Sequence, residues 1–284
     1  MKTVLITGAG SGIGKAAAKM FLADGYNVYA AARRTERMND LKELGAHIIR
    51  LDVCDDLSCR KCFEQICRES GGVDILVNNA GYGEYGPVEV VDLSDAQRQL
   101  EVNVYGAVRM AKLVIPYMRE KHSGRIINIS SAAGRVTTYM GGWYHATKYA
   151  LEALSDSLRM ELHDDGIDVV LIEPGGVRSE WGSIAADNLT RASKGTVYED
   201  RADSVAAAYR EMYTPTNQHL TSPEKAARVI CRAATARRPK TRYLFGYGAK
   251  GLIIAHAVLP NRAFDSLMRR MYNSGLAKRI TKKQ

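Results

Sequence analysis

The chain has 284 residues, of which 46% are hydrophobic and 25% are charged, a composition that suits one large folded domain and excludes a disordered protein. Its net charge of +9 is uneven, because residues 237–284 carry twelve Lys and Arg against one acid, or +11, and the other 236 residues sum to −2. The first residues read as a strand and no apolar run is long enough to span a bilayer, so we expect no secretory leader, no membrane span and a cytoplasmic protein.

Short apolar runs alternate with helical patterns through most of the sequence. The expected strands are Thr3–Thr7, Asn27–Ala32, His47–Leu51, Asp74–Val77, Arg125–Ser130, Asp168–Ile172 and a later Arg242–Phe245. The expected helices cover Ile13–Ala23, Thr35–Leu44, Leu57–Ser70, Ser94–Glu120 and Tyr144–His163. The strands are continuously apolar, which is typical of strands covered on both faces. We therefore predict an α/β fold, a doubly wound, Rossmann-like parallel sheet with helices on both faces, as a single domain over residues 1–284.

Two segments late in the chain have their own character. Residues 180–220 are weakly patterned and follow the end of a strand, where we expect a lid over the substrate. Residues 246–284 form a basic tail with two amphipathic helical segments. A solvated surface and a peripheral contact with a membrane or an acidic partner both remain open for this tail, because Leu252, Ile253 and Leu267 lie among its basic residues. We expect no nucleic acid partner, since no recognition motif is present.

A glycine-rich turn joins the first strand to the first helix, with the sequence Thr7-Gly8-Ala9-Gly10-Ser11-Gly12-Ile13-Gly14. Glycines let the backbone approach a pyrophosphate closely, and the free N–H groups of the following helix then face that anion. The spacing is Gly-x3-Gly-x-Gly, and Ile13 stands where the GxGxxG fingerprint would have its last glycine. Its place between strand and helix nevertheless predicts a dinucleotide site.

The end of the second strand predicts which dinucleotide binds. An acid that would hold the ribose diol of NAD is absent, and Arg33 and Arg34 stand where the 2′-phosphate of NADP needs neutralising. We therefore expect NADP(H).

The five cysteines do not predict a metal or redox site. Cys59-x-x-Cys62 has a suitable spacing, but neither a second such pair nor a pair of histidines accompanies it. Cys59, Cys62 and Cys67 share one stripe of an expected helix, so we interpret them as buried packing residues and expect no metal.

A tyrosine and a lysine one helical turn apart occur twice in the chain. Tyr144-x3-Lys148 opens a predicted helix thirteen residues after Ser131, which follows the fifth strand. For the second pair, Tyr117–Lys121, the residue thirteen positions earlier is a valine. We therefore take the first pair as the candidate site and the second as a structural pair.

In these motifs and their order the sequence resembles the single-domain branch of the short-chain dehydrogenase/reductase family over Lys2 to Ser179. The residues that carry the resemblance are Thr7-Gly8-x3-Gly12-x-Gly14, Asp52-Val53, Asn78-Asn79-Ala80-Gly81, Asn103, Ser131, Tyr144-x3-Lys148 and Pro174-Gly175-Gly176-Val177, with Ser179 in place of the usual threonine.

The resemblance implies a catalytic role for four residues. Tyr144 would be the general acid of carbonyl reduction and the base of alcohol oxidation, with its pKa lowered by Lys148 and by the positive nicotinamide. Lys148 would also hold the nicotinamide ribose. Ser131 would hydrogen-bond the substrate oxygen, and Asn103 would bind a water that links Lys148 to solvent.

The resemblance also implies the cofactor contacts and the face from which the hydride leaves. By analogy, Asp52 and Val53 would border the adenine, and Asn79, Ala80 and Gly81 would lie on the ribose-nicotinamide side. The hydride would leave from the pro-S face of NADP(H). The full set of expected cofactor-binding residues is Gly8, Ser11, Gly12, Ile13, Gly14, Arg33, Arg34, Asp52, Val53, Asn79, Ala80, Gly81, Tyr144, Lys148, Pro174, Gly175, Val177 and Ser179.

Bulky apolar residues near the expected pocket indicate a small hydrophobic carbonyl or alcohol substrate. Besides Ser131 and Tyr144, we expect Met140 and Trp181 to contact it. The long tail and the arginine pair are similar to the hydroxysteroid and retinol dehydrogenase-like subgroup, which implies a steroid-, retinoid- or long-chain-like substrate. The resemblance further implies a homo-oligomer, a dimer or tetramer, in which the helices Ser94–Glu120 and Tyr144–His163 are candidates for the interface.

Two other functions remain open. A 3-oxoacyl-carrier-protein reductase shares the chemistry, and the basic tail would suit its acidic carrier. A non-enzymatic dinucleotide sensor would share the fold, but such proteins generally lose the Tyr/Lys pair. A nucleotide-sugar epimerase would need a longer chain with a substrate domain, so we do not favour it.

Overall fold

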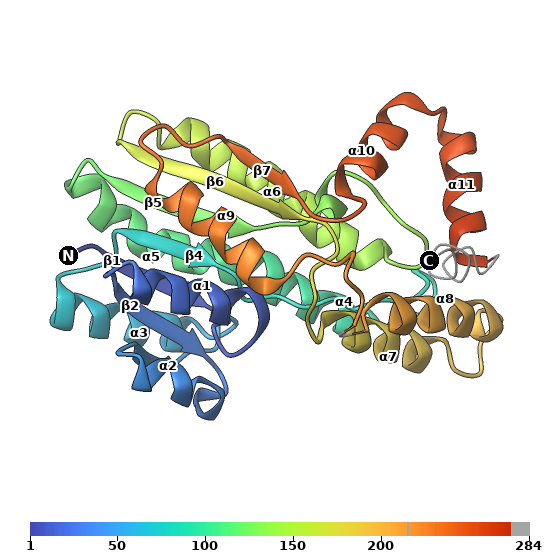
Figure 1. Ribbon diagram of the computed structural model, residues 1–284, viewed down its shortest axis with the longest axis horizontal. Helices are drawn as coiled ribbons and strands as arrows, with labels where there is room; N and C mark the ends of the chain where they lie inside the picture. Colours follow the sequence, from blue (N-terminus) through green and yellow to red (C-terminus); the bar gives the residue numbers. More distant parts are fainter. Residues whose placement is uncertain (215, 274–284) are drawn as a thin grey trace.

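Seven apolar segments pair into one parallel sheet in the computed structural model, which describes residues 1–214 and 216–273 (Figure 1). In chain order the strands are β1 (Thr3–Thr7), β2 (Asn27–Ala32), β3 (His47–Arg50), β4 (Ile75–Asn78), β5 (Gly124–Ile129), β6 (Ile167–Pro174) and β7 (Arg242–Phe245). They lie in the order β3-β2-β1-β4-β5-β6-β7. The predicted doubly wound parallel sheet is therefore confirmed.

Helices connect these strands and cover both faces of the sheet (Figure 1). The α-helices are α1 (Gly12–Ala23), α2 (Asn39–Glu43), α3 (Asp56–Ser70), α4 (Leu93–Leu100), α5 (Gly106–Glu120), α6 (Gly142–Glu161), α7 (Trp181–Ser193), α8 (Glu199–Met212), α9 (Pro223–Thr235), α10 (Ala249–Val258) and α11 (Asn261–Asn273). Three short turns complete the set, namely the 3-10 segments η1 (Thr35–Met38) and η3 (Ala132–Gly134) and the π-helical segment η2 (Glu101–Tyr105).

Alternate residues of each strand face opposite layers of helices. Val4 and Ile6 of β1 pack with α1 and α9, whereas Leu5 packs with α3 and α5. All three side chains are fully buried. Because both faces of the sheet are covered, the strands are apolar throughout, as the sequence pattern predicts.

The strand order reverses beside β1, with β2 and β3 on one side and β4 to β7 on the other. Loops that leave the carboxyl ends of β1 and β4 therefore diverge, and a crevice opens between them. Thr7 ends β1 and Asn78 ends β4, so the glycine turn and the segment after Asn78 form its two sides.

The helix predicted over Ser94–Glu120 is helical throughout but changes its geometry in the middle. Between α4 and α5 the segment η2 is a π-helical turn, and it contains Asn103. Such a turn inserts an extra residue into a helix and is frequent at functional sites. The 3.6-residue pattern of the sequence does not reveal it.

The sequence pattern predicts no helix between α6 and the tail, where the described residues form three. The segment 180–220, predicted as a lid, contains α7 and α8, which pack against each other through Ala185, Leu189 and Val205. Helix α9 has no counterpart among the predicted helices. Its start carries a recognisable signal, because Ser222 accepts a hydrogen bond from the Lys225 amide at 3.3 Å and Pro223 occupies the first turn.

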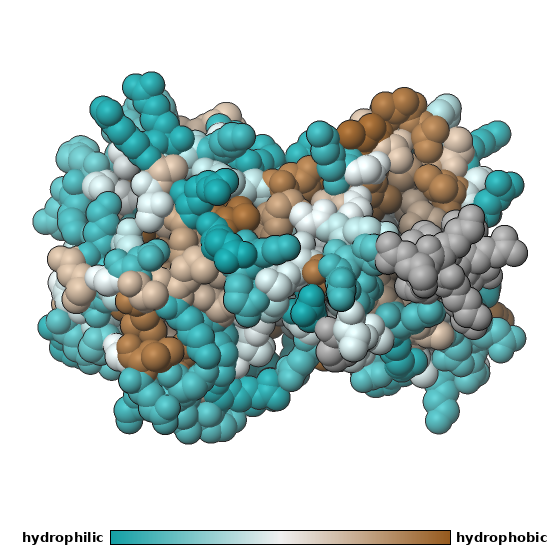
Figure 2. Space-filling view, in the orientation of Figure 1, coloured by the Kyte–Doolittle hydropathy of each residue, from teal (hydrophilic) through white to brown (hydrophobic). Residues whose placement is uncertain are grey.

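The predicted tail is only partly amphipathic. Helix α11 buries Phe264 and Met268 and exposes its arginines, as predicted. Helix α10 differs, since Lys250 is its one Lys, Arg or acidic residue and its outer face is apolar, with Ile254 50% and Val258 74% exposed (Figure 2). Residues 274–284 lie outside the described residues. In the described part of the chain, no helix is both long and apolar enough to cross a membrane.

The cysteines of α3 are packing residues. Cys59 and Cys62 are buried, whereas Cys67 is only partly buried, which corrects the prediction for that residue. Burial raises the pKa of the Cys59 thiol to about 11 and that of Cys62 to about 12. Both therefore stay neutral thiols near neutral pH.

Candidate active site

The glycine turn after β1 is held against the end of β4. Gly8 has φ +67° and Gly12 has φ +54°, a backbone conformation that favours glycine. A Cβ on Gly8 would lie 2.8 Å from the Cα of Ala80, and one on Gly14 would meet the side-chain nitrogen of Asn79. The turn therefore keeps its close approach only with glycine at these positions.

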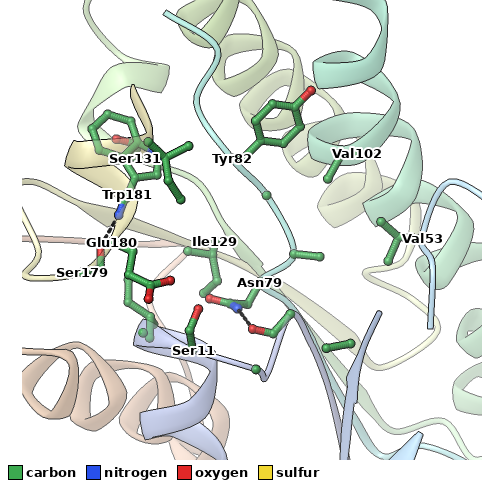
Figure 3. A pocket seen from close by; sticks show the side chains of 18 of the residues that line it. Ser11, Val53, Asn79, Tyr82, Val102, Ile129, Ser131, Ser179, Glu180 and Trp181 are labelled. Atoms are coloured by element: carbon green, nitrogen blue, oxygen red, sulfur yellow. Dashed lines mark hydrogen bonds between the residues drawn. The ribbon is translucent and has the colours of Figure 1, made fainter. Parts of the chain in front are cut away.

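Thr7 and Asn79 connect the two sides of the crevice. The Thr7 hydroxyl accepts hydrogen bonds from the amides of Asn79 and Ala80, each at 3.0 Å. The Asn79 side chain donates to the carbonyl of Thr7 at 3.0 Å. It also donates to the carbonyl of Gly8 at 3.1 Å (Figure 3). The sequence predicts Asn79 as a cofactor contact, and the structure adds that its side chain fixes the turn.

A cleft of about 670 Å³ follows the carboxyl ends of the strands. Most of the predicted site residues line it together, namely Gly8, Ser11, Gly12, Ile13, Arg33, Arg34, Asp52, Val53, Asn79, Ala80, Gly81, Ser131, Tyr144, Lys148, Pro174, Gly175, Val177, Ser179 and Trp181. Gly14, Asn103 and Met140 are not among the lining residues. Gly14 lies behind the turn, against Asn79.

Tyr144 and Lys148 lie on one buried face of α6. Their side chains are 7% exposed each, and both reach the cleft. Lys148 Nζ donates to the Ile129 carbonyl at 2.9 Å and lies 5.8 Å from the centre of the Tyr144 ring. Ser131 caps η3 by accepting from the Ala133 amide at 3.1 Å, and it donates to the Pro174 carbonyl at 3.3 Å. Helix α6 and the start of η3 thus present one phenol, one amine and one hydroxyl to the same cleft.

Burial shifts the pKa values of this group in opposite directions. It raises the pKa of Tyr144 to about 12, and the hydrogen bond with Ser131 opposes the rise. It lowers the pKa of Lys148 to about 8, and the charge of Glu152 opposes this fall. Burial therefore acts against the predicted lowering of the Tyr144 pKa, which depends on the charge of the bound nicotinamide as well as on Lys148 and stays a prediction.

The side-chain amide of Asn103 has partners within the protein, and the predicted water at this residue stays a prediction. Its side chain accepts from the Tyr82 amide at 3.0 Å and donates to the Tyr82 carbonyl at 2.9 Å. It also donates to the Thr147 hydroxyl at 3.1 Å. The amide is thus used within the protein, where it clamps the loop after Gly81 against α6 beside Lys148.

The second Tyr/Lys pair is a surface feature. The Lys121 side chain is exposed to solvent, whereas that of Lys148 is buried. Lys121 Nζ forms hydrogen bonds with the Tyr117 hydroxyl at 2.9 Å and with Asp74 at 2.7 Å. Neither Tyr117 nor Lys121 lines the cleft. The interpretation of this pair as structural agrees with its position.

Arginines surround the cleft beyond the end of β2. Within residues 1–214 and 216–273, neither Arg33 nor Arg34 has an ion-pair partner, and both are exposed at the lining. Arg37, one helical turn further, also lines the cleft and pairs with Glu180 at 3.1 Å. Sequence reasoning missed Arg37, although its spacing from Arg34 in a helical segment was a usable signal.

An aromatic cluster closes the end of the cleft at Tyr144. The Trp181 ring lies 5.3 Å from that of Tyr144 and 5.5 Å from that of Tyr213, measured between ring centres (Figure 3 shows Trp181). The Tyr85 ring lies 5.6 Å from that of Tyr144 and 5.5 Å from that of Trp181, so the three rings contact one another. Met140, predicted as a substrate contact, packs within this cluster with a left-handed backbone of φ +60° instead of lining the cleft.

The donor set fits a dinucleotide. The glycine turn leaves no room for a Cβ at Gly8 and would let a pyrophosphate approach the start of α1. Asp52 and Val53 line one part of the cleft, and Tyr144 and Lys148 line another. The residues would therefore hold an extended ligand between the arginines and the phenol.

Comparisons with known proteins agree with this geometry. Residues 2–188 match the family model described as short chain dehydrogenase. A probable short-chain type dehydrogenase/reductase of Helicobacter pylori is 35% identical over 93% of this chain and 96% of its own length. A 3-ketodihydrosphingosine reductase of Bacteroides thetaiotaomicron is 34% identical, covering 86% and 87%. An NADPH-dependent 3-dehydrocapnine reductase of Ornithobacterium rhinotracheale is 32% identical, covering 94% and 96%. A solved short-chain dehydrogenase from Streptomyces avermitilis superposes with a TM-score of 0.77 at 31% identity, covering 100% and 98%.

Proposed function

The chain belongs to the short-chain dehydrogenase family, and from this premise we propose that it is an NADP(H)-dependent oxidoreductase that interconverts a hydrophobic ketone and its alcohol. Family membership makes it a nicotinamide-dependent oxidoreductase of CH–OH and C=O groups. The observation that carries the finer proposal is the convergence of Ser131, Tyr144 and Lys148 at one end of a cleft whose other end is lined by Arg33 and Arg34.

In the proposed mechanism the bound nicotinamide supplies the hydride for reduction or accepts it in oxidation. Ser131 would hydrogen-bond the substrate oxygen, and Tyr144 would donate its phenolic proton to that oxygen during reduction. In oxidation Tyr144 would take the proton from the alcohol. Lys148 would hold the ribose and keep a positive charge near the phenol, which works against the high pKa that burial gives Tyr144.

Asn103 would act indirectly in this mechanism. It holds the backbone of Tyr82 and the hydroxyl of Thr147, so it would position Lys148 and the loop that follows Gly81. The proposed proton path also includes a water between Lys148 and solvent.

NADP(H) is the proposed cofactor because the cleft has arginines and no acid directly at the end of β2. Arg33 and Arg34 lack ion-pair partners among the described residues and would supply charge-assisted hydrogen bonds to a 2′-phosphate. The printed name of one relative, an NADPH-dependent reductase, supports the same preference.

A hydrophobic substrate is proposed from the wall near Tyr144. Trp181, Tyr213 and Ile184 line this end of the cleft, and α7 and α8 would form the lid over it. The names of two relatives, a 3-ketodihydrosphingosine reductase and a 3-dehydrocapnine reductase, support a keto substrate. A steroid-, retinoid- or long-chain-like carbonyl compound remains our proposal, with a 3-oxoacyl thioester as the alternative.

A panel of carbonyl compounds tests this proposal. The panel holds ketosteroids, retinal, long-chain ketones, 3-oxoacyl thioesters and small polar ketones, each with NADPH, and NADPH oxidation is followed. We expect turnover with the apolar carbonyls. Turnover restricted to 3-oxoacyl thioesters would favour the alternative, and turnover restricted to small polar ketones would contradict the hydrophobic pocket.

A peripheral membrane contact is proposed for the outer face of α10. Ile254 and Val258 are largely exposed there, and apolar surface gathers over this helix in Figure 2. Basic residues lie close in the sequence, with Lys250 in α10 and Arg262 and Arg269 in α11. Apolar side chains next to basic ones suit a surface of anionic lipid.

The double variant Ile254→Asp/Val258→Asp should lose co-sedimentation with anionic vesicles. Burying one such side chain contributes roughly 1.5–3 kcal/mol, so the affinity should fall at least about tenfold. Leu57→Asp, at an exposed position of α3, is the matched control and should bind as the unaltered protein does. Equal sedimentation of both variants would contradict the contact.

The assembly and compartment are proposed on separate grounds. Tyr105, at the start of α5, and Tyr149, Leu154 and Met160 of α6 are exposed apolar residues on the helices predicted to form an oligomer interface. We propose a homodimer or tetramer through these helices. All five cysteines are free thiols, which supports a reducing compartment such as the cytoplasm.

A further inference from the structure

Two buried carboxylates lie next to the catalytic group without belonging to it. Glu152 follows Lys148 by one turn on α6, and Glu173 lies in β6 immediately before Pro174. Glu152 is 5% exposed and Glu173 is fully buried. Buried acids carry a large desolvation cost unless they are paired or protonated.

A single guanidinium lies between these carboxylates. Arg242 of β7 places Nε 3.1 Å from Glu152 Oε2 and 3.0 Å from Glu173 Oε1. A second guanidinium nitrogen of Arg242 reaches Asp156 at 2.5 Å. One guanidinium therefore forms ion pairs with three carboxylates, and two of these, Glu152 and Glu173, are buried from water.

Two further arginines and Lys148 complete the charged surroundings of the pair. Arg159 pairs with Oδ1 of Asp156 at 3.0 Å. Arg135, itself partly exposed, reaches Glu173 at 3.4 Å. Lys148 faces Glu152 from the preceding turn of α6, and the charge of Glu152 acts on it. Glu152 thus has Arg242 as its ion-pair partner in the described part of the chain.

A buried hydroxyl, that of Ser130, lies beside the Glu152 carboxyl group. Glu152 Oε1 and Ser130 Oγ are both buried, and neither has a hydrogen-bond partner within the described residues. A Cβ placed on Gly134 would lie 2.8 Å from Glu152 Cγ, 2.9 Å from Ser130 Oγ and 3.1 Å from the Lys148 carbonyl oxygen. The acid and the hydroxyl are therefore close neighbours behind Lys148, and the hydroxyl can donate to an ionised Glu152 or accept from a protonated one.

We propose that Glu152, which packs against Arg242 and lies one helical turn from Lys148, is a positioning residue whose charge controls whether Lys148 is an ammonium. The proposal rests on the proposed function in one respect, since it takes Lys148 as the residue that assists Tyr144. An ionised Glu152 favours the protonated lysine, and a neutral Glu152 removes that support.

The direction of the pKa shifts agrees with this arrangement. Burial raises the pKa of Glu152, and the nearby charge of Glu173 raises it further, against the opposing effects of Ser130 and Arg242. Burial lowers the pKa of Lys148, and Glu152 opposes that change. As the pH rises, Glu152 becomes ionised first and then helps Lys148 to keep its proton to higher pH. Glu152 would thus extend, toward higher pH, the range over which Lys148 stays protonated and the site stays active.

Neutralising Glu152 should lower the pH at which Lys148 loses its proton. Glu152→Gln removes the supporting charge, and the shift should be about tenfold in proton concentration. Glu173→Gln should leave the Lys148 midpoint near that of the unaltered protein, because Glu152 is already ionised where Lys148 titrates. Asp156→Asn, which touches the same Arg242 but lies further from Lys148, is the control and should leave the titration in place.

The titration is measured by NMR of the full-length protein labelled with ¹³C at the lysine ε-carbon, without any cofactor. The Lys148 signal is assigned by its loss in Lys148→Met. A midpoint that falls in Glu152→Gln and stays in place in Glu173→Gln supports the proposal. An unmoved midpoint in Glu152→Gln, or an equal fall in Glu173→Gln or Asp156→Asn, would overturn it, because the effect would then not belong to the charge of Glu152.

The pH profile of turnover separates this proposal from the proposed function. If Lys148 assists Tyr144, the alkaline limb of carbonyl reduction should move in Glu152→Gln in the same direction as the NMR midpoint. NMR midpoints that move while the turnover profile does not would uphold the coupling of Glu152 to Lys148 and would count against the catalytic role of Lys148. Thermal unfolding of each variant confirms that the compared proteins are folded.

Discussion

Tyr144→Phe is expected to lose most of its carbonyl reduction while still binding NADPH. The substitution removes only the phenolic oxygen, so the ring keeps its contacts with Trp181 and Tyr85. General acid–base assistance is typically worth about 10²–10⁴ in rate, and kcat should fall by that factor. Steady-state turnover gives the loss, and quenching of protein fluorescence by NADPH gives the binding.

Tyr117→Phe is the matched control for this variant. Tyr117 also stands four residues before a lysine, with its hydroxyl bonded to Lys121, but it lies on the surface away from the cleft. Turnover should remain near that of the unaltered protein. Full activity in Tyr144→Phe would contradict the mechanism, and a protein that binds NADPH tightly without turning over any carbonyl would favour the sensor alternative.

Arg33→Ala/Arg34→Ala is expected to weaken NADPH binding and leave NADH binding unchanged. A hydrogen bond to a charged group contributes about 1.5–3 kcal/mol, so losing one such contact weakens NADPH binding roughly tenfold to a hundredfold. The dissociation constants of NADPH and NADH, measured on the same preparation, show the difference directly. The ratio of the two constants is the informative quantity, because NADH lacks the 2′-phosphate.

Arg60→Ala, an exposed arginine of α3 outside the cleft, is the control for the removal of positive charge. Equal weakening of NADPH and NADH by the arginine double variant would mean that the two side chains act on the cleft in general and not on the phosphate. A protein that prefers NADH before any substitution would overturn the proposed cofactor and leave the catalytic residues standing.

The parallel sheet could be predicted from the sequence because its signals are local. An apolar run bounded by turn residues, such as Thr3–Thr7 before the glycine turn, is a strand in any doubly wound fold. The convergence of Ser131, Tyr144 and Lys148 could be predicted because their order and spacing place them after β5 and at the start of α6.

Other features depend on tertiary contacts that no local pattern reports. The π turn at Asn103 has the composition of an ordinary helix, and its hydrogen bonds to Tyr82 and Thr147 appear only in the folded chain. Met140 looked like a substrate contact because it is bulky and close to Tyr144, but it packs within the aromatic cluster. The burial that raises the pKa of Tyr144 in the protein without cofactor could likewise not be read from the sequence.

The pair Glu152 and Glu173 shows the same limit more clearly. The two acids are 21 positions apart, and Arg242 lies a further 69 residues along the chain. Only the pairing of β6 with β7 brings Arg242 beside them. Charged residues on a helix and at strand ends usually read as surface groups, so their burial behind Lys148 is a property of the fold and not of any motif.

The most direct test of hydride transfer is the mass of the alcohol formed from NADPH that carries deuterium at one face of C4. The carbonyl compound that is reduced fastest in the panel is incubated with the 4S-deuterated cofactor and, separately, with the 4R-deuterated one. We predict that the alcohol gains one deuterium from the 4S cofactor and none from the 4R cofactor. An alcohol without deuterium from either cofactor, or no alcohol at all, would contradict the proposal that this protein passes a hydride between NADP(H) and a carbonyl substrate.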